Sequence, residues 1–163
     1  HTASAGVSGP QYLDYSVTIE PSCTVATNST SFGSYSDTAG TQTGLPAGSV
    51  QVTCSAGASY VVAFDGGVNG DGLSARFMAN TADPTITIGY DLLYGTTVVG
   101  DADATSVDPS YTSPGQPFAA AGITQASATG STETYSLTAD VYLGDAGGAF
   151  GTYTDSVGVS VVY

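Results

Sequence analysis

Few residues of this chain have side chains that could catalyse a reaction. The only histidine, His1, could hold copper at the N-terminus only with a second histidine, which the chain lacks. His1 is also the only candidate base for a Ser–His–Asp triad, and it lies at a terminus that we expect to be mobile. Paired carboxylates could hydrolyse sugars, but the acidic residues occur mostly in glycine-rich stretches and the chain has no tryptophan. We therefore predict no catalytic residue and no enzymatic activity.

Two acidic clusters could in principle bind a metal ion. The first is a broken version of a calcium-binding loop, formed by Asp65, Asn69 and Asp71. Gly67 stands where the next carboxylate belongs, and no bidentate Glu follows at the required place. The second cluster consists of Asp101, Asp103 and Asp108. Because both ligand sets are incomplete, we interpret them as solvated turn residues and predict no metal and no cofactor.

The two cysteines are a third candidate for chemistry. Cys23 and Cys54 each lie in a strand-like stretch, and the pattern favours a disulfide over two free thiols in a secreted chain. The disulfide would stabilise the fold by about 3–4 kcal/mol, mainly by restricting the unfolded chain. Two cysteines and one distant histidine cannot supply the four ligands of a structural zinc site.

Charge and length exclude several classes of partner. The formal net charge is −13, there is no lysine, and Arg76 is the only arginine. Nothing is therefore available to neutralise phosphates of nucleic acids or of anionic membrane surfaces. No run of about 18 apolar residues occurs, so we expect no membrane insertion.

The sequence begins at His1 and not at Met, which we interpret as a mature form after signal removal. Asn28 begins an N-glycosylation sequon.

The elements that must position these residues are strands. Short alternating apolar runs recur between Gly, Asn, Asp and Pro residues, and no helical period of useful length appears, which predicts an all-β sandwich or barrel. We expect strands at about 12–19, 22–27, 48–55, 59–65, 74–79, 86–95, 134–143 and 156–163. The long segment 96–132 should contain a further short strand near 117–126. We expect one domain, with an N-terminal arm over 1–20 and a body over 21–163.

The two ends of the chain suggest a role in assembly. In the arm, one face of the expected strand is apolar and the other is mostly polar; the apolar face carries Leu13, Tyr15, Val17 and Ile19. At the other end, the last expected strand lacks the charge or proline that usually protects a sheet edge. Its alternate residues Val157, Val159, Val161 and Tyr163 would form the edge of a groove that accepts an arm. The arm would then add a strand to another copy; in the alternative arrangement, 12–19 pairs within its own chain.

Several segments of the body resemble the spore coat protein U family, whose members include pilins of archaic (Csu-type) chaperone–usher pili. The similar segments keep the family's order over about 22–163, and they are 23–25, 32–35, 50–54, 60–67, 76–80, 90–94 and 151–163. The last of these is the most similar. The chain departs from the family after Tyr94, where a Trp-Gly pair is frequent and this sequence has no tryptophan.

The resemblance implies an incomplete immunoglobulin-like β-sandwich that lacks its last strand and is completed by donor-strand exchange. It also implies a periplasmic chaperone and an outer-membrane usher as partners during assembly. The product would be a linear homopolymer, an extracellular pilus for adhesion or biofilm formation, in which the arm docks antiparallel to 156–163 of the neighbouring copy. Two other functions stay open, namely a monomeric or tip adhesin and a coat or sheath protein.

Overall fold

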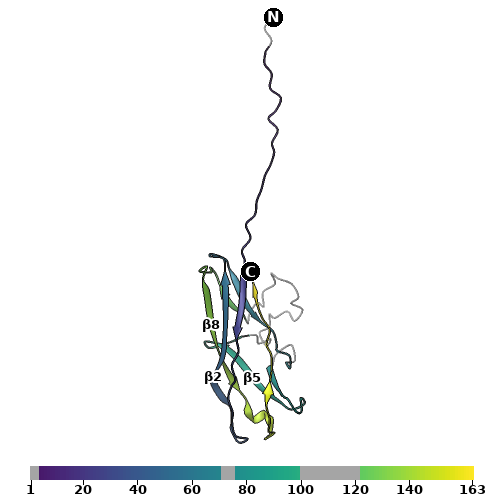
Figure 1. Cartoon of the computed structure of the whole chain (residues 1–163), viewed down its shortest axis with the longest axis vertical. Coiled ribbons are helices and arrows are strands. Elements are labelled where there is room, and N and C mark those ends of the chain that lie inside the picture. Colours follow the sequence, from purple (N-terminus) through teal and green to yellow (C-terminus); the bar gives the residue numbers. More distant parts are fainter. Residues whose placement is uncertain (1–3, 71–75, 100–121) are drawn as a thin grey trace.

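The computed structural model describes residues 4–70, 76–99 and 122–163. The described residues form β-strands and one short 3-10 helix, η1 (Leu143–Ala146). The strands run along the long axis of the body (Figure 1). The prediction of an all-β fold is confirmed.

Most strands belong to one antiparallel sheet of seven strands. Its order is β1 (Cys23–Asn28), β2 (Gln42–Cys54), β8 (Thr132–Val141), β5 (Thr87–Tyr94), β4 (Arg76–Asn80) and β9 (Tyr153–Thr154), and β6 (Thr97–Val98) pairs with β5. β1 is therefore one edge of this sheet.

The second sheet has three antiparallel strands in the order β10 (Val159–Val162), β3 (Tyr60–Phe64) and β7 (Ile123–Gln125). Buried side chains from both sheets form one hydrophobic cluster, which includes Val50, Val52, Val62, Phe64, Leu92 and Val141. β10 is an edge of the second sheet, as β1 is of the first.

The predicted strands of the body overlap observed ones at β1, β2, β3, β4, β5, β8 and β10, and β7 falls inside the predicted range 117–126. β6 and β9 have two residues each and were not predicted. β2 begins at Gln42, six residues before the predicted start, since two irregularities in its pairing with β8 accommodate Gly44, Pro46 and Gly48.

The predicted strand over 12–19 pairs with no strand of its own chain. Residues 4–22 are extended, without secondary structure, and every side chain among them is exposed. Figure 1 shows this arm projecting from the end of the body where β1 begins. A β-strand requires a neighbour for its hydrogen bonds. The prediction of a strand is therefore wrong for the isolated chain.

The body has a disulfide end and a far end. The disulfide end contains Cys23 and Cys54, and the arm leaves from it; the far end contains η1 and residues 147–152 (Figure 1). β1 runs away from the disulfide end, whereas β10 runs towards it (Figure 1). These two edge strands are therefore antiparallel to each other.

Candidate functional site: an open groove between two sheet edges

β1 and β10 face each other across a gap in the sandwich. Within the described residues, β1 pairs only with β2 and β10 pairs only with β3. Parts of the two edge strands nevertheless approach each other, with Cα atoms within 8 Å. Each of them therefore keeps one side on which no described strand pairs with its main chain.

The hydrogen-bond pattern shows which main-chain groups point into the gap. The Ser55 N–H donates to the Ser22 C=O (2.9 Å), so Ser22 faces β2. On the other side, the Asp65 N–H donates to the Gly158 C=O (2.9 Å), so Gly158 faces β3. Main-chain groups alternate in direction along a strand. The groups that point into the gap therefore belong to Cys23, Val25 and Thr27 on one edge and to Val157, Val159 and Val161 on the other.

The gap opens into a groove with a volume of about 940 Å³. One wall consists of residues 27–37 and the other of residues 148–157 with Val159. Buried apolar side chains from both sheets line its floor, among them Val50, Phe64, Met78, Ile88, Leu92 and Val141. The groove therefore gives access from the surface to the hydrophobic core.

The predicted groove residues lie together on β10 and the residues that flank it. Val157, Val159 and Val161 are half-buried and pack against the core cluster, whereas Ser156, Gly158 and Ser160 are exposed. Tyr163, the last predicted member, is 54% exposed. Of these residues, Val157 and Val159 line the groove, each with an apolar side chain and an unpaired main-chain edge.

The predicted arm residues lie away from the groove in this structure. Leu13, Tyr15, Val17 and Ile19 are 79%, 85%, 88% and 91% exposed, respectively. Four large apolar side chains in one short segment are costly to leave in water, at about 1.5–3 kcal/mol each. The isolated chain therefore contains both an apolar groove and an apolar segment of a kind that could fill it.

Polar residues position the segment that precedes β10, and the sequence alone did not connect these residues with that segment. The Asp65 carboxylate accepts hydrogen bonds from the N–H groups of Gly67 (2.9 Å) and Gly158 (2.8 Å). The Asn69 side chain donates to the Thr154 C=O (2.8 Å) and to the Asp155 carboxylate (3.1 Å). Apart from the bond between Asp65 and Gly67, these bonds join positions 85 to 93 residues apart, so no local signal could have revealed them. They fix residues 154–158, which cross from the large sheet to the small one.

A buried tyrosine supports the same segment from the core. The Tyr90 hydroxyl donates to the Asp155 carboxylate, and the Tyr90 side chain is only 4% exposed. Burial, and then this hydrogen bond, raise the pKa of Tyr90 well above its ordinary value. The hydroxyl therefore stays protonated and remains a donor to Asp155 at neutral pH.

Asp65 and Asn69 thus hold a strand in place. Within residues 4–70, 76–99 and 122–163, no group of three or more His, Cys, Asp or Glu side chains is arranged to bind a metal ion. Asp71 and the second acidic cluster, Asp101, Asp103 and Asp108, lie outside the described residues.

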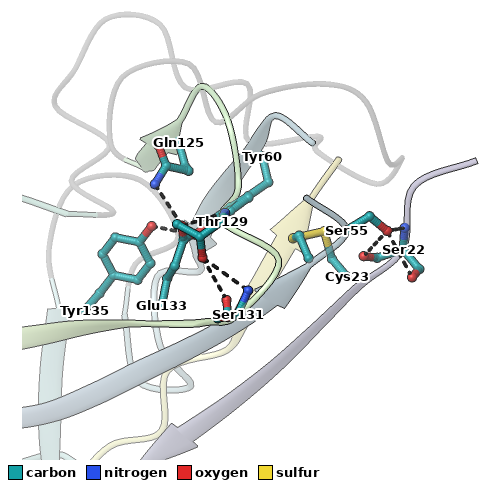
Figure 2. Close-up of a disulfide and its surroundings, with 10 residues drawn as sticks. Ser22, Cys23, Ser55, Tyr60, Gln125, Thr129, Ser131, Glu133 and Tyr135 are labelled. Atoms are coloured by element: carbon teal, nitrogen blue, oxygen red, sulfur yellow. Dashed lines mark hydrogen bonds between the residues drawn. A yellow bond between two sulfur atoms is a disulfide. The ribbon is translucent and has the colours of Figure 1, made fainter. Parts of the chain in front are cut away.

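Cys23 and Cys54 form the predicted disulfide, with their Cα atoms 4.1 Å apart (Figure 2). They are directly opposite each other in the pairing of β1 with β2. The prediction of a disulfide is confirmed, and it fixes the first residue of the groove edge on β1.

A polar cluster lies in the same region of the disulfide end (Figure 2). The Tyr60 hydroxyl donates to the Glu133 carboxylate and lies 2.5 Å from the Tyr135 hydroxyl. Glu133 also accepts hydrogen bonds from the Gln125 side chain (3.2 Å) and the Thr129 N–H (3.2 Å). The bond from Tyr60 lowers the pKa of Glu133, and burial raises the pKa of Tyr60. This cluster links β3, β7 and β8.

No helix within the described ranges has the length and hydropathy needed to cross a membrane. No curated protein matches the chain.

Several chains of solved structures are similar to this one, among them two whose descriptions name an adhesion subunit or an adhesin. One belongs to the CsuC–CsuE chaperone–tip adhesion subunit pre-assembly complex from archaic chaperone–usher Csu pili of Acinetobacter baumannii. It matches with a TM-score of 0.53 and 16% identity over 90% of this chain and 40% of that chain. The other is the Salmonella SafD adhesin, with a TM-score of 0.34 and 14% identity over 87% of this chain and 96% of that one. The present chain thus spans less than half of the Csu chain that it matches.

The first likeness shows that the body has the all-β, immunoglobulin-like fold of chaperone–usher pilus subunits, as the sequence predicted. In a comparison with protein families, residues 10–160 match the Spore Coat Protein U domain. The match covers the second half of the arm and nearly the whole body. The chain therefore belongs to the Spore Coat Protein U domain family, whose members are structural subunits and not enzymes.

Proposed function

We propose that the chain is a repeating subunit of an extracellular pilus and that it polymerises by inserting its arm into the groove of the next copy. One observation carries the proposal. The same chain has a groove that opens onto the core between two unpaired strand edges and an exposed extended arm with one apolar face. An inserted strand would pair with both edges at once and close the core with its apolar side chains.

The arm and the groove edge match in length. The arm has four inward positions from Leu13 to Ile19, and the edge has four from Val157 to Tyr163, so that each set spans about 20 Å at about 3.3 Å per residue. Directly opposite residues in an antiparallel pair point to the same face. This favours one antiparallel register, with the pairs Leu13–Tyr163, Tyr15–Val161, Val17–Val159 and Ile19–Val157.

The direction of insertion decides what kind of assembly forms. If the arm runs antiparallel to β10, Ile19 lies at the far end of the acceptor, so the donor's body must lie beyond that end. Each copy then joins its disulfide end to the far end of the next, which is a head-to-tail contact that does not close. If the arm runs parallel to β10, Ile19 lies at the disulfide end. Two copies could then exchange arms in a closed dimer, or one copy could fold back on itself at residues 20–22.

The antiparallel arrangement therefore forms part of the proposal. A periplasmic chaperone would cover the groove before assembly and an outer-membrane usher would exchange it for the arm, so the subunit would reach the cell surface through the periplasm. The similarity to a chain from a chaperone–tip adhesion subunit complex supports a chaperone as partner. The same similarity makes a tip adhesin the second candidate function, and a coat or sheath protein is a further alternative. The presence of both an arm and a groove favours a repeating subunit. Such a subunit must donate one strand and accept another, whereas a subunit at the tip needs to do only one of these.

The test is a pair of substitutions on opposite faces of the arm in the full-length chain. Val17→Asp should abolish polymers in electron micrographs and in native gels, because burying an unpaired carboxylate costs several kcal/mol. Ser16→Asp places the same charge on the outward face and should leave polymerisation close to wild type. If the Val17→Asp chain still polymerises, the arm is not the donor. If the wild-type chain gives only closed dimers, the arm inserts in the parallel direction.

A further inference from the structure

Phe150 is the most exposed large apolar side chain of the described body, at 82%. Its main chain is nevertheless held firmly. The Asn80 side chain, 2% exposed, donates to the Phe150 C=O (3.0 Å) and accepts a hydrogen bond from the Ala82 N–H (2.9 Å). At Gly151, where φ is +132°, a Cβ atom would lie 2.9 Å from the Asn80 side chain. The loop is therefore built around Asn80.

Hydrogen bonds within the same loop add to this support. The Tyr153 hydroxyl donates to the Ala149 C=O (3.0 Å), and the Ala149 N–H donates to the Ala146 C=O (3.1 Å). The exposed Phe150 ring contributes no packing energy to its own chain, although the loop that carries it is ordered. A contact between this ring and another molecule would explain why the loop holds it in this position.

The position of Phe150 indicates which molecule that is. Phe150 belongs to the residues that line the groove, at its far end. The opposite wall there includes Tyr35, which is 40% exposed. The Tyr35 hydroxyl donates to the Phe32 C=O (2.6 Å), which fixes the orientation of the ring. Two aromatic side chains, one from each wall, thus lie where the groove opens to solvent.

We propose that Phe150 and Tyr35 bind the linker Glu20–Ser22 of the incoming copy, with the ring of Pro21 packed against Phe150. This inference rests on the proposed function and on its antiparallel register. With Ile19 opposite Val157, the donor chain leaves the groove at the far end, and only three residues remain before Cys23 begins the donor's body. Those three residues must therefore pass between the walls that carry Phe150 and Tyr35.

The chemistry of the linker fits this site. The proline ring is apolar and its φ is already restricted, so it loses little conformational entropy on binding. Glu20 and Ser22 are polar and can remain in water. The contact would couple the linker to the acceptor's far end and so limit the angles between successive bodies. The aromatic pair would thus determine the stiffness of the polymer at each joint.

The experiment uses the full-length Val17→Asp chain as an acceptor that cannot donate its own arm. Two fluorescent peptides serve as donors, residues 4–19 and residues 4–22, and their affinities are compared by fluorescence anisotropy. The longer peptide should bind about 5- to 10-fold more tightly, as expected for one added apolar–aromatic contact. Phe150→Ser in the acceptor should remove this advantage and leave the shorter peptide unaffected. Pro21→Ala in the longer peptide should reduce its advantage in the same way.

Val68→Ser is the matched control, because Val68 is 75% exposed and does not line the groove. It should change neither affinity. If neither peptide binds, the proposed function is wrong. If the shorter peptide binds but the longer one is no tighter, or if Phe150→Ser leaves the advantage intact, the linker site is wrong and the proposed function stands.

Discussion

Gly158 lies where the Asp65 carboxylate approaches the main chain at the start of the groove edge. The carboxylate accepts the Gly158 N–H (2.8 Å), and the Asp65 N–H donates back to the Gly158 C=O (2.9 Å). A Cβ atom at Gly158 would lie 2.3 Å from the nearer carboxylate oxygen. A larger residue at position 158 would therefore displace the Asp65 carboxylate, which makes this glycine one determinant of the groove edge.

Gly158→Ala should destabilise the body and loosen its groove edge. The Asp65 side chain would have to move, and it would lose hydrogen bonds of the charged kind, which contribute about 1.5–3 kcal/mol each. We expect a melting temperature about 4–8 °C lower in the Val17→Asp background, measured by circular dichroism. Gly144→Ala is the control, because a Cβ atom there meets nothing within 4 Å. Equal melting temperatures for the two variants would show that the Asp65 contact is unimportant.

Two buried tyrosines make the free energy of unfolding depend on pH in the alkaline range. Burial first, and then hydrogen bonds to Glu133 and Asp155, raise the pKa values of Tyr60 and Tyr90 above the ordinary value of 10.0. The unfolded chain therefore loses these protons first. The stabilisation is complete below about pH 10 and declines as the pH rises from there towards the raised folded-state values.

Absorbance of tyrosinate at 295 nm measures this effect. The chain has 11 tyrosines, and we expect two steps, the second coinciding with the loss of the β-sheet signal in circular dichroism. In concentrated guanidinium a single step near pH 10 should replace them. One step in water, with the sheet signal still native after it, would contradict the assignment of Tyr60 and Tyr90 as buried donors.

At the scale of elements, the sequence predicts strands better than it predicts their edges. Alternation located the strands of the body that have four or more residues, because one face of each is buried. The early half of β2 was missed, since Gly44, Pro46 and Gly48 are turn signals that the irregular pairing with β8 tolerates. β9 has only two residues and depends on its pairing with Asn80 and Ala79, which no local pattern reveals.

The candidate site was predicted to different degrees on its two sides. The alternation of the valines near the end of the chain follows from the period-2 rule alone, and Val157 and Val159 are among the residues that line the groove. The opposite edge, β1, was not predicted as part of the groove, because its position depends on how the two sheets pack. Phe150 was missed for a similar reason. A single aromatic residue in a glycine-rich loop has no periodicity, and only the fold reveals that it lines the groove.

Reduction of the disulfide should affect the β1 side of the groove more than the β10 side. The bridge closes a loop of 31 residues and holds Cys23 opposite Cys54, so its loss should cost about 3–4 kcal/mol of unfolding free energy. Urea unfolding of the Val17→Asp chain, with and without reductant, measures this cost. Hydrogen exchange should then show faster opening of 23–28 than of 159–162. Equal acceleration in both segments would mean that the bridge stabilises the whole body and not one edge.

At the scale of the whole molecule, charge opposes assembly. The 14 acidic residues face a single arginine, and Arg76 is only 5% exposed. The surface of the described body therefore carries carboxylates with no exposed lysine or arginine to offset them. The proposed arm also carries charge, at Asp14 and Glu20, so an incoming donor is repelled by the copy that it must enter.

Polymerisation of the purified chain should therefore accelerate with ionic strength. The Debye length falls from about 30 Å at 0.01 M salt to about 8 Å at 0.15 M, so repulsion between whole subunits is largely screened at the higher value. We expect the initial rate of polymerisation, measured by light scattering, to rise about tenfold or more.

A chain with Asp14→Asn and Glu20→Gln should polymerise faster at low salt and should respond less to added salt. This control separates charge screening from a general salting-out of apolar surface, which would accelerate both chains equally. A rate that falls with salt in the unmodified chain would require an attractive pair of charges between subunits, and the chain's one arginine is buried too deeply to provide it.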